Sequence, residues 1–307
     1  MKPKHFISLS ELSGAELDAL LDLSARIKAE PQRFATALQG QVLAMIFEKP
    51  SLRTRATFEI GMLQLGGHAL YLTNTEIGLG KREAIKDVAR NLSRWAQAIM
   101  ARTFAHETVL ELAEHASIPV INGLTNLLHP CQALADLFTL REKKGRLAGL
   151  KLAFVGDGNN VAHSLMLAGA RSGMHVTVVC HPSYKPDPRL TERAERIALE
   201  TGARIEVSND LAAGLAQADA IYADVFASMG FEAEREERLR ALMPYQVNAA
   251  VMRLARPDAV FLHCLPAHRG EEVTEEVLEG PQSVVFDQAE NRLHAQKALL
   301  VSLMAGG

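Results

Sequence analysis

The chain alternates short apolar runs with segments in which apolar residues recur at helical spacing. Val42–Phe47 is a continuous apolar run of strand length, and Phe58, Met62 and Leu65 follow it at intervals of three or four residues. This pattern predicts a strand and then a helix that starts near Ser51. Because the same order repeats along the chain, it predicts a parallel sheet. In the first half the predicted strands are 42–47, 68–72, 97–101 and 118–122.

Helices are predicted between and around these strands. Ser13 and Glu16 have the spacing of a capping box at the start of a leucine-rich segment. Pro130 stands in the first turn of another helical segment, where proline is tolerated. The predicted helices include 83–95, 106–115, 130 to about 143, and about 288 to 304.

The second half repeats the strand and helix order with its own set of apolar runs. The predicted strands are 150–155, 175–180, 204–207, 218–223, 259–263 and 283–286. At 307 residues the chain exceeds the usual size of a single core. We therefore predict an α/β protein of two doubly wound parallel-sheet domains joined by interdomain helices. The predicted domains are 1–145 and 146–287, divided at a polar, glycine-containing turn, and 288–307 is predicted to be a helix that packs back on the first domain.

Composition excludes several classes of protein. Net charge is −3, which disfavours nucleic acid as a partner, because binding to its backbone would need a concentrated cationic face. Apolar runs are too short to span a bilayer, and Met1 to Ser13 lacks the apolar core of a signal peptide. We expect a cytoplasmic protein that binds neither nucleic acid nor membrane.

Three cysteines, Cys131, Cys180 and Cys264, are widely spaced along the chain. An odd count without paired ligand spacing argues against a disulfide framework and against a zinc site. We expect reduced thiols and no bound metal. A lone cysteine is more often inert core than catalyst, although Cys264 ends a predicted buried strand at His263-Cys264-Leu265-Pro266.

The most informative segment is Ser51-Leu52-Arg53-Thr54-Arg55, where hydroxyls and guanidiniums meet the start of a helix. Free N–H groups and the helix dipole favour an anion there, and arginine offers a planar fork to oxyanions. We therefore predict a phosphate site with Ser51 and Thr54 hydroxyls and Arg53 or Arg55. The alternative is an ordinary capped helix with a solvated basic first turn.

Gly156-Asp157-Gly158-Asn159-Asn160 follows a strand and precedes a helix, as a dinucleotide fingerprint does. The third glycine of that motif is missing, and no acidic residue ends the next strand. NAD binding is therefore not expected, and the asparagines can instead offer amide N–H groups to a small ligand.

Other polar residues also stand where predicted strands end or helices begin. Arg102 follows the third strand, and His129 and Gln132 flank the start of a helix, so they are expected at one crevice. Asp224 follows a strand and is suited to an ammonium group, and Ser228-Met229-Gly230 reads as a mobile loop. The plainer alternatives are a surface ion pair for Arg102 and a helix cap for His129.

Taken in order, these motifs resemble the aspartate/ornithine carbamoyltransferase family over nearly the whole chain. The early motifs, 51–55, Arg102-Thr103 and 129–132, are similar to those of the family at large. The later ones, Ser228-Met229-Gly230, His263 to Pro266 and Gln288 to Arg292, resemble those of members that use ornithine. The resemblance implies carbamoyl phosphate and L-ornithine as substrates, citrulline and phosphate as products, a place in arginine metabolism, and no cofactor.

The resemblance also implies roles for residues of this sequence. The implied reaction is attack by the neutral δ-amine on the carbamoyl carbon, through a tetrahedral intermediate that expels phosphate. Implied catalytic residues are Arg102, His129, Cys264 and Arg292. Implied carbamoyl-phosphate ligands are Ser51, Leu52, Arg53, Thr54, Arg102, His129, Gln132, Cys264, Leu265 and Arg292, and implied ornithine ligands are Asn160, Asp224, Ser228 and Met229.

Two positions depart from the family pattern. Gly78 stands where members usually carry a glutamine that reaches carbamoyl phosphate in a neighbouring subunit, and Lys81 or Arg82 is a candidate substitute. Phe226 stands where tryptophan is common. The resemblance further implies a homotrimer. The alternatives are a carbamoyltransferase for another amine, such as putrescine or an N-acylated ornithine, and a non-catalytic ligand-binding relative.

Overall fold

Two compact units make up the structure, a computed structural model that describes residues 4–227 and 234–305. Unit 1 comprises residues 1–138 with 290–307, and unit 2 comprises 139–289. Two helices pass from one unit into the other along the chain, α6 (Pro130–Lys144) and α13 (Val285–Met304). The division falls inside α6, whereas the sequence predicted it at the polar turn after this helix.

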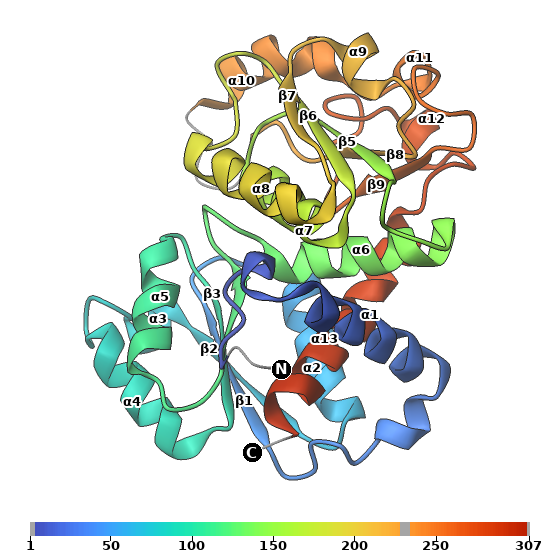
Figure 1. Ribbon diagram of the computed structural model, residues 1–307. Coiled ribbons are helices and arrows are strands. Elements are labelled where there is room, and N and C mark those ends of the chain that lie inside the picture. Colours follow the sequence, from blue (N-terminus) through green and yellow to red (C-terminus); the bar gives the residue numbers. More distant parts are fainter. Residues whose placement is uncertain (1–3, 228–233, 306–307) are drawn as a thin grey trace. The chain divides into compact units, whose positions relative to one another are not determined.

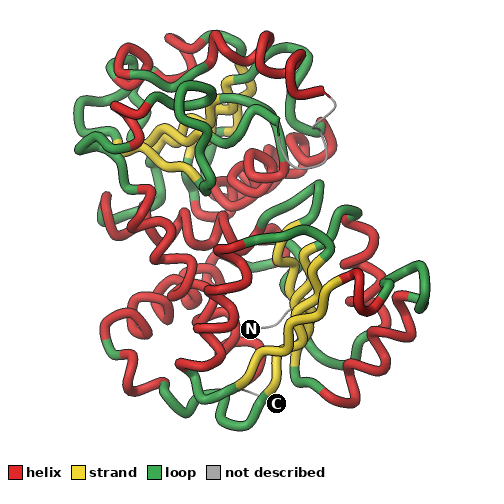
Figure 2. Tube along the Cα trace, turned by 180° about the vertical axis from the view of Figure 1, so that it is seen from behind, coloured by secondary structure: helices red, strands yellow, loops and turns green. Residues whose placement is uncertain are grey.

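Unit 1 is built on a four-stranded parallel sheet in the order β2-β1-β3-β4. Helices cover both of its faces (Figure 2). The strands are β1 (Val42–Phe47), β2 (His68–Thr73), β3 (Ala98–Arg102) and β4 (Val120–Leu124). The helices are α1 (Gly14–Ala29), α2 (Leu52–Gln64), α3 (Asn74–Ile77), α4 (Ile85–Trp95), α5 (His106–His115) and the first part of α6 with the last part of α13.

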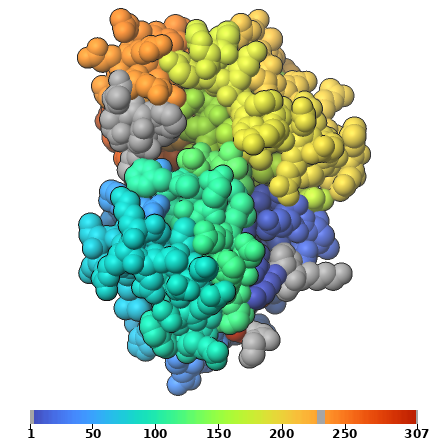
Figure 3. All heavy atoms as spheres, turned by 90° about the vertical axis from the view of Figure 1, so that its left-hand side faces the viewer, coloured from blue at the N-terminus to red at the C-terminus, as the bar shows by residue number. Residues whose placement is uncertain are grey.

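The two faces of this sheet follow from the alternation of side chains along each strand. Ala44 and Ile46 of β1 and Ile99 of β3 join one apolar cluster with residues of α4 and α5. These two helices form the surface of unit 1 that faces the viewer in cyan and teal in Figure 3. On the other face lie α1, α2 and α13 (Figure 1).

In unit 1, α13 packs closely against α2. A side chain at Gly61 of α2 would meet the Cγ atom of Lys297 at 3.3 Å, so the glycine permits the approach. Thr57 donates to the Gln296 amide oxygen over 3.0 Å, and Lys297 donates to Gln64 over 3.0 Å. These contacts fix the face of α13 that points toward α2.

Unit 2 is built on a five-stranded parallel sheet in the order β7-β6-β5-β8-β9. One apolar cluster joins strands β5, β8 and β9 to the helices from α9 onward, and α7 packs beside α8 (Figure 1). The strands are β5 (Lys151–Val155), β6 (His175–Val179), β7 (Ile205–Ser208), β8 (Ala220–Ala223) and β9 (Val260–His263). The helices are α7 (Asn160–Ser172), α8 (Pro188–Thr201), α9 (Leu211–Leu215), α10 (Arg235–Leu242), α11 (Ala249–Met252) and α12 (Glu275–Leu278), with the remaining parts of α6 and α13.

The predicted fold class is confirmed, since both sheets are wholly parallel and carry helices on their two faces. Nine of the predicted strands are present, shifted by at most two residues. The strand predicted at 283–286 is wrong. Ser283 forms a single bridge to Phe261, and α13 already begins at Val285. A run of four apolar or small residues fits a first helical turn as well as a strand.

No helix within residues 4–227 and 234–305 combines the length and the apolar character needed to cross a bilayer.

Candidate functional site

In each sheet the strand order reverses at one point, and polar residues gather there. In unit 1 the reversal lies between β1 and β3, and in unit 2 between β5 and β8. Loops that leave the carboxyl ends of such neighbouring strands run in opposite directions and open a crevice. The predicted site residues follow these four strands or lie beside them.

The turn from β1 to α2 presents the first half of the unit 1 site. Ser51 is extended and caps α2, since its Oγ accepts a hydrogen bond from Thr54 N over 3.2 Å. Leu52 begins the helix with its side chain 76% exposed, so only its backbone is suited to a polar ligand. The free N–H groups and dipole of this first turn favour an anion.

Strand pairing brings Arg102 to the same turn. Arg102 is the last residue of β3 and pairs in register with Phe47, the last residue of β1. Its carbonyl accepts from Glu48 N over 2.9 Å, and its Nη1 donates to Thr54 Oγ1 over 3.4 Å. The sequence placed Arg102 just after the strand, and its position inside the strand makes it rigid.

Arg292 of α13 is the third side chain at this place and is only 1% exposed. Its Nη2 donates to Thr54 Oγ1 over 3.3 Å, and its Nη1 donates to Gln132 Oε1 over 2.6 Å. Gln132 in turn donates from Nε2 to Asp136 Oδ1 over 2.8 Å. Thr54 therefore accepts hydrogen bonds from two guanidiniums, those of Arg102 and Arg292. Gln132 of α6 accepts a further hydrogen bond from Arg292.

His129 lies beside these guanidiniums at the start of α6. Burial lowers its pKa well below the ordinary value of 6.5, and the positive charges of Arg292, Arg102 and Arg53 lower this pKa further. The imidazole is therefore neutral near pH 7 and can donate one N–H or accept at one nitrogen. We call Arg53, Arg102 and Arg292 with His129 the cation cluster. Three guanidiniums gathered around a neutral imidazole favour an anionic ligand.

In unit 2, Asp224 follows β8 and is buried. Asn159 Nδ2 donates to its Oδ2 over 2.7 Å, while Asn159 Oδ1 caps α7 by accepting from Val161 N and Ala162 N. The sequence singled out both asparagines for a small ligand, but the resemblance implied only Asn160, the first residue of α7, as an ornithine ligand. The sequence signal for Asn159 was its position directly before a predicted helix, where an asparagine side chain caps the helix and is held in a fixed orientation.

Cys264 meets the same carboxylate. Its Sγ donates to Asp224 Oδ1 over 3.0 Å, so the predicted thiol and the predicted carboxylate lie together. Leu265 has a φ of +57° and donates its N–H to His263 Nδ1 over 2.8 Å. Because Nδ1 accepts, Nε2 carries the proton and donates to Glu272 Oε1 over 3.2 Å.

Glu272 was missed by the sequence analysis because nothing in its acidic neighbourhood distinguishes it from a solvated charge. A buried ion pair was also missed. Arg238 of α10 donates to Asp157 Oδ2 over 2.9 Å. Burial raises the pKa of Asp157 from 3.8 to about 6, although the charge of Arg238 acts in the opposite direction. This pair joins α10 to the loop that carries Asn159.

The predicted residues thus form one group in each unit. Ser51, Arg53, Thr54, Arg102, His129, Gln132 and Arg292 come together in unit 1, and Asp224, Cys264 and Leu265 come together in unit 2 with Asn160 at the adjacent helix start. The predicted Ser228 and Met229 lie outside the described residues.

The glycines of 156–158 have structural roles in unit 2. A side chain at Gly158 would come within 2.3 Å of Pro186 N, and Gly156 has a φ of +134° with Phe226 packed over it. Within the described part of the chain, two groups of side chains could hold a metal ion: Asp224 with His263 and Cys264, and His268 with Glu271 and Glu272. In the first group the thiol already donates to the carboxylate.

Gly78, which departs from the family pattern, ends α3 in the left-handed region at a φ of +62°. A Cβ atom there would come within 2.6 Å of the Cβ atom of Arg82. Glycine is therefore required by the local backbone, and a glutamine at this position would be strained.

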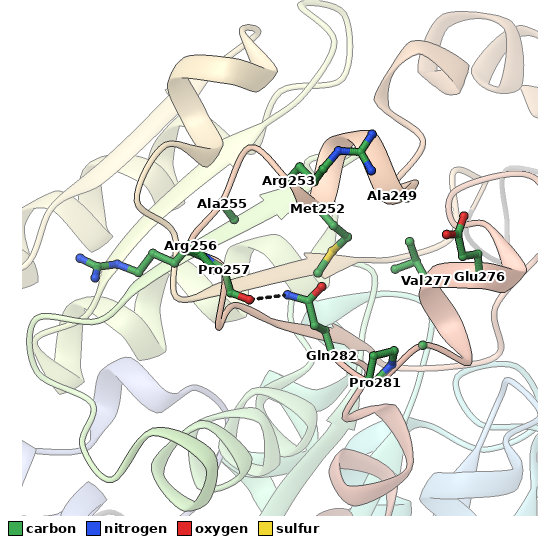
Figure 4. A pocket seen from close by; sticks show the side chains of 11 residues that line it. Ala249, Met252, Arg253, Ala255, Arg256, Pro257, Glu276, Val277, Pro281 and Gln282 are labelled. Atoms are coloured by element: carbon green, nitrogen blue, oxygen red, sulfur yellow. Dashed lines mark hydrogen bonds between the residues drawn. The ribbon is translucent and has the colours of Figure 1, made fainter.

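A separate pocket of about 350 Å³ lies in unit 2 beside α11 and α12 (Figure 4). It contains none of the predicted site residues. Gln282 directs its amide to the backbone carbonyls of Pro257 and Ala259, and Arg256 pairs with Asp219. Gln282 and Arg256 are therefore engaged with the protein rather than directed at a ligand.

Comparison with known proteins gives consistent matches over the chain. Residues 4–142 match the family model described as aspartate/ornithine carbamoyltransferase, carbamoyl-P binding domain, and residues 148–303 match the Asp/Orn binding domain of the same family. An ornithine carbamoyltransferase of Anoxybacillus flavithermus is 56% identical over 99% of this chain and 98% of its own length.

Solved structures agree with this result. Ornithine carbamoyltransferase from Pyrococcus furiosus is 50% identical, with a TM-score of 0.96 over 99% of this chain and 97% of that one. An acetylornithine transcarbamylase complexed with acetylcitrulline is 33% identical, with a TM-score of 0.89 over 98% of this chain and 99% of that one.

Proposed function

Because this chain belongs to the aspartate/ornithine carbamoyltransferase family and is a carbamoyltransferase that uses ornithine, we propose that unit 1 binds carbamoyl phosphate and unit 2 binds L-ornithine. The reaction forms L-citrulline and phosphate and belongs to arginine biosynthesis. The single observation that carries the assignment of unit 1 is the cation cluster at the start of α2.

The phosphate of the substrate is proposed to lie at the first turn of α2. Backbone N–H groups from Ser51 to Thr54 and the guanidiniums of Arg53 and Arg102 are the ligands. This choice is supported by the helix dipole, which favours an anion at that end. It is also supported by the positive charge of the guanidiniums, which attracts an anion without a bound metal ion. As the C–O bond of this mixed anhydride breaks, negative charge builds up on the departing phosphate, so the same groups stabilise its departure.

The carbamoyl carbonyl is proposed to lie near His129, Gln132 and Arg292. Attack by the amine converts this carbonyl oxygen into an oxyanion, which needs donors that are already oriented. Arg292 is held in place by Thr54 and Gln132. A neutral His129 can donate a hydrogen bond to the oxyanion but, unlike an imidazolium, is not acidic enough to protonate the attacking amine. The predicted contacts of Cys264 and Leu265 with the carbamoyl group stay predictions.

Ornithine is proposed to bind in unit 2 through Asp224 and Asn160, with Ser228 and Met229 in the segment that follows. A buried carboxylate is suited to an ammonium group, and Asn159 holds Asp224 in place. The neutral δ-amine attacks the carbamoyl carbon, a C–N bond forms and the C–O bond to phosphate breaks. The amine proton leaves with the phosphate, so the reaction balances without a cofactor.

Other amine acceptors are less well supported. The acetylornithine enzyme is 33% identical to this chain, whereas the ornithine enzymes reported above are 50% and 56% identical. A panel of L-ornithine, N-acetylornithine and putrescine with carbamoyl phosphate tests the acceptor directly. Citrulline formation from ornithine at a kcat/KM at least a hundredfold above the other two is expected, and a preference for either of them would contradict the proposal.

Arg53→Ala and Arg55→Ala form a matched pair for the phosphate site. Both residues belong to the first turn of α2, but Arg55 lies over the Tyr71 ring at 3.8 Å and pairs with Glu59. Arg53→Ala is expected to lower kcat/KM for carbamoyl phosphate by about 10² to 10³, the usual loss of a charged ligand to the reacting group. Arg55→Ala is expected to stay within about threefold of the parent. Equal effects of the two substitutions would remove Arg53 from the site.

A non-catalytic relative would bind carbamoyl phosphate without turnover, so an inactive parent chain that still binds it would favour that alternative.

We also propose a homotrimer in the cytoplasm, on the family resemblance. Light scattering on the purified chain measures its mass in solution, and a monomer at micromolar concentration would contradict the trimer.

A further inference from the structure

In unit 2, the turn after β9 brings an imidazole and two carboxylates together. Gly270, at a φ of +88°, reverses the chain, and Glu271 N donates to the His268 carbonyl over 2.9 Å. As a result, His268 Nδ1 lies 3.9 Å from Glu271 Oε2 and 3.8 Å from Glu272 Oε2. These three atoms come from a segment of only five residues.

Glu272 is the feature of this turn that a solvated charge cluster does not explain. The residue is fully buried, and its Oε1 accepts from His263 Nε2 and from His268 N over 2.6 Å. Its Oε2 is also buried and has no hydrogen-bond partner. A buried carboxylate oxygen without a partner is costly, and this one faces the His268 imidazole at a distance too long for a hydrogen bond.

The neighbouring charges are arranged so that each of the three groups keeps one ligand atom available. Glu271 pairs with Arg235 through Oε1 and leaves Oε2 toward His268. Arg269, the nearest cation in sequence, is occupied by Glu275 and Glu279. His268 is 47% exposed, so an ion can reach the turn from solvent.

We propose that His268 Nδ1, Glu271 Oε2 and Glu272 Oε2 form a binding site for a divalent transition cation of the Zn²⁺ type. Zn²⁺ binds imidazole nitrogens and carboxylate oxygens, and three protein ligands leave its fourth position to water. Bonds of about 2.1 Å would place tetrahedral ligands about 3.4 Å apart. The two distances from His268 Nδ1 exceed this by about half an ångström, and all three ligand atoms lie within 4.8 Å of one another. The site is distinct from the group at Cys264 and stands independently of the proposed function.

Cobalt is a suitable probe because its spectrum reports its ligands. Co²⁺ titrated into the full chain is expected to bind at one site without a thiolate charge-transfer band and to be displaced by Zn²⁺. His268→Gln is expected to weaken this binding at least tenfold, and Glu271→Gln should do the same. His68→Gln, which removes an exposed histidine of β2 in unit 1, is the matched control and should leave the affinity unchanged.

Thermal unfolding gives a second measurement that does not depend on activity. Zn²⁺ is expected to raise the Tm of the parent and of His68→Gln but not that of His268→Gln, because an ion that binds the folded chain stabilises it. Parent-like Co²⁺ affinity in His268→Gln would overturn the proposal. So would Co²⁺ binding that always carries the thiolate band and is lost in Cys264→Ser.

Discussion

Arg292 on α13 donates from Nη1 to the side-chain oxygen of Gln132 on α6 over 2.6 Å, although 160 residues separate the two along the chain. The same guanidinium reaches Thr54 of α2 and Gln296 one turn further along its own helix. Three partners therefore fix the plane of this group before any ligand arrives. Buried donors that are already oriented stabilise the charge that develops in a transition state without having to reorganise.

Arg292→Lys tests whether this geometry, rather than the charge alone, is needed. A lysine keeps the charge but cannot donate in three directions within one plane. We expect kcat to fall by about 10²-fold, the usual effect of losing one oriented donor at an oxyanion. His294→Gln, two residues along the same helix, should leave kcat within about twofold of the parent. Steady-state citrulline assays measure both, and an unchanged kcat in Arg292→Lys would show that charge is sufficient.

His129 should make folding stability depend on pH. Its pKa is lowered well below 6.5 in the folded chain, whereas the unfolded chain titrates near 6.5. Below 6.5 the unfolded state therefore binds the additional proton. The free energy of unfolding should fall as pH drops from 6.5 toward the folded pKa and should be level above 6.5, with a slope of up to about 1.4 kcal/mol per pH unit from this group.

His129→Gln should remove this part of the slope. Urea unfolding of parent and variant between pH 5 and 7.5 measures the difference, which cancels the contributions of other histidines. Curves that stay parallel over the whole range would show that His129 is not held neutral.

The buried pair of Asp157 and Arg238 should be more costly to break than to replace. Arg238→Met leaves a buried carboxylate without its cation, for which we expect a loss of about 3–5 kcal/mol in the free energy of unfolding. Asp157→Asn combined with Arg238→Met should recover most of it. Denaturant unfolding of the single and double variants checks this, and a double variant as unstable as Arg238→Met would argue against the pair.

On the family resemblance, Lys81 is a candidate substitute for a glutamine at the position of Gly78. It is exposed near the end of α3, whereas Arg82 donates to the Glu76 carbonyl over 3.1 Å. Lys81→Ala is expected to raise the KM for carbamoyl phosphate severalfold with little change in the KM for ornithine. Arg82→Ala is the matched control and should leave the KM for carbamoyl phosphate unchanged. Equal KM values for Lys81→Ala and the parent would show that Lys81 does not take the role of the glutamine.

Much of the fold could be predicted because its signals are local. Val42–Phe47 is a strand over the predicted residues, and Ser51 caps the helix that follows. Arg102 could be placed at a carboxyl edge of the sheet, within reach of a ligand, because it follows a predicted strand. The wrong strand at 283–286 arose from a run too short to distinguish a strand from a helical turn.

The contacts that organise each site could not be predicted from local signals. Thr54 and Arg292 meet across 238 residues, and no periodicity indicates that one hydroxyl serves two guanidiniums. Asn159 rather than Asn160 reaches Asp224, a difference of one residue that depends on where α7 begins. Glu272 looks like a surface acid in sequence, and only the fold shows that it is buried against His263.

Unit 1 is discontinuous, since residues 139–289 separate its larger part from the segment that carries Arg292. During translation the amino-terminal strands emerge first and domains begin to fold as they appear. A ribosome that has released only the first 138 residues therefore carries a sheet whose cation cluster still lacks the guanidinium of Arg292. The nascent chain can complete the cation cluster only after the whole of the other unit has been synthesised.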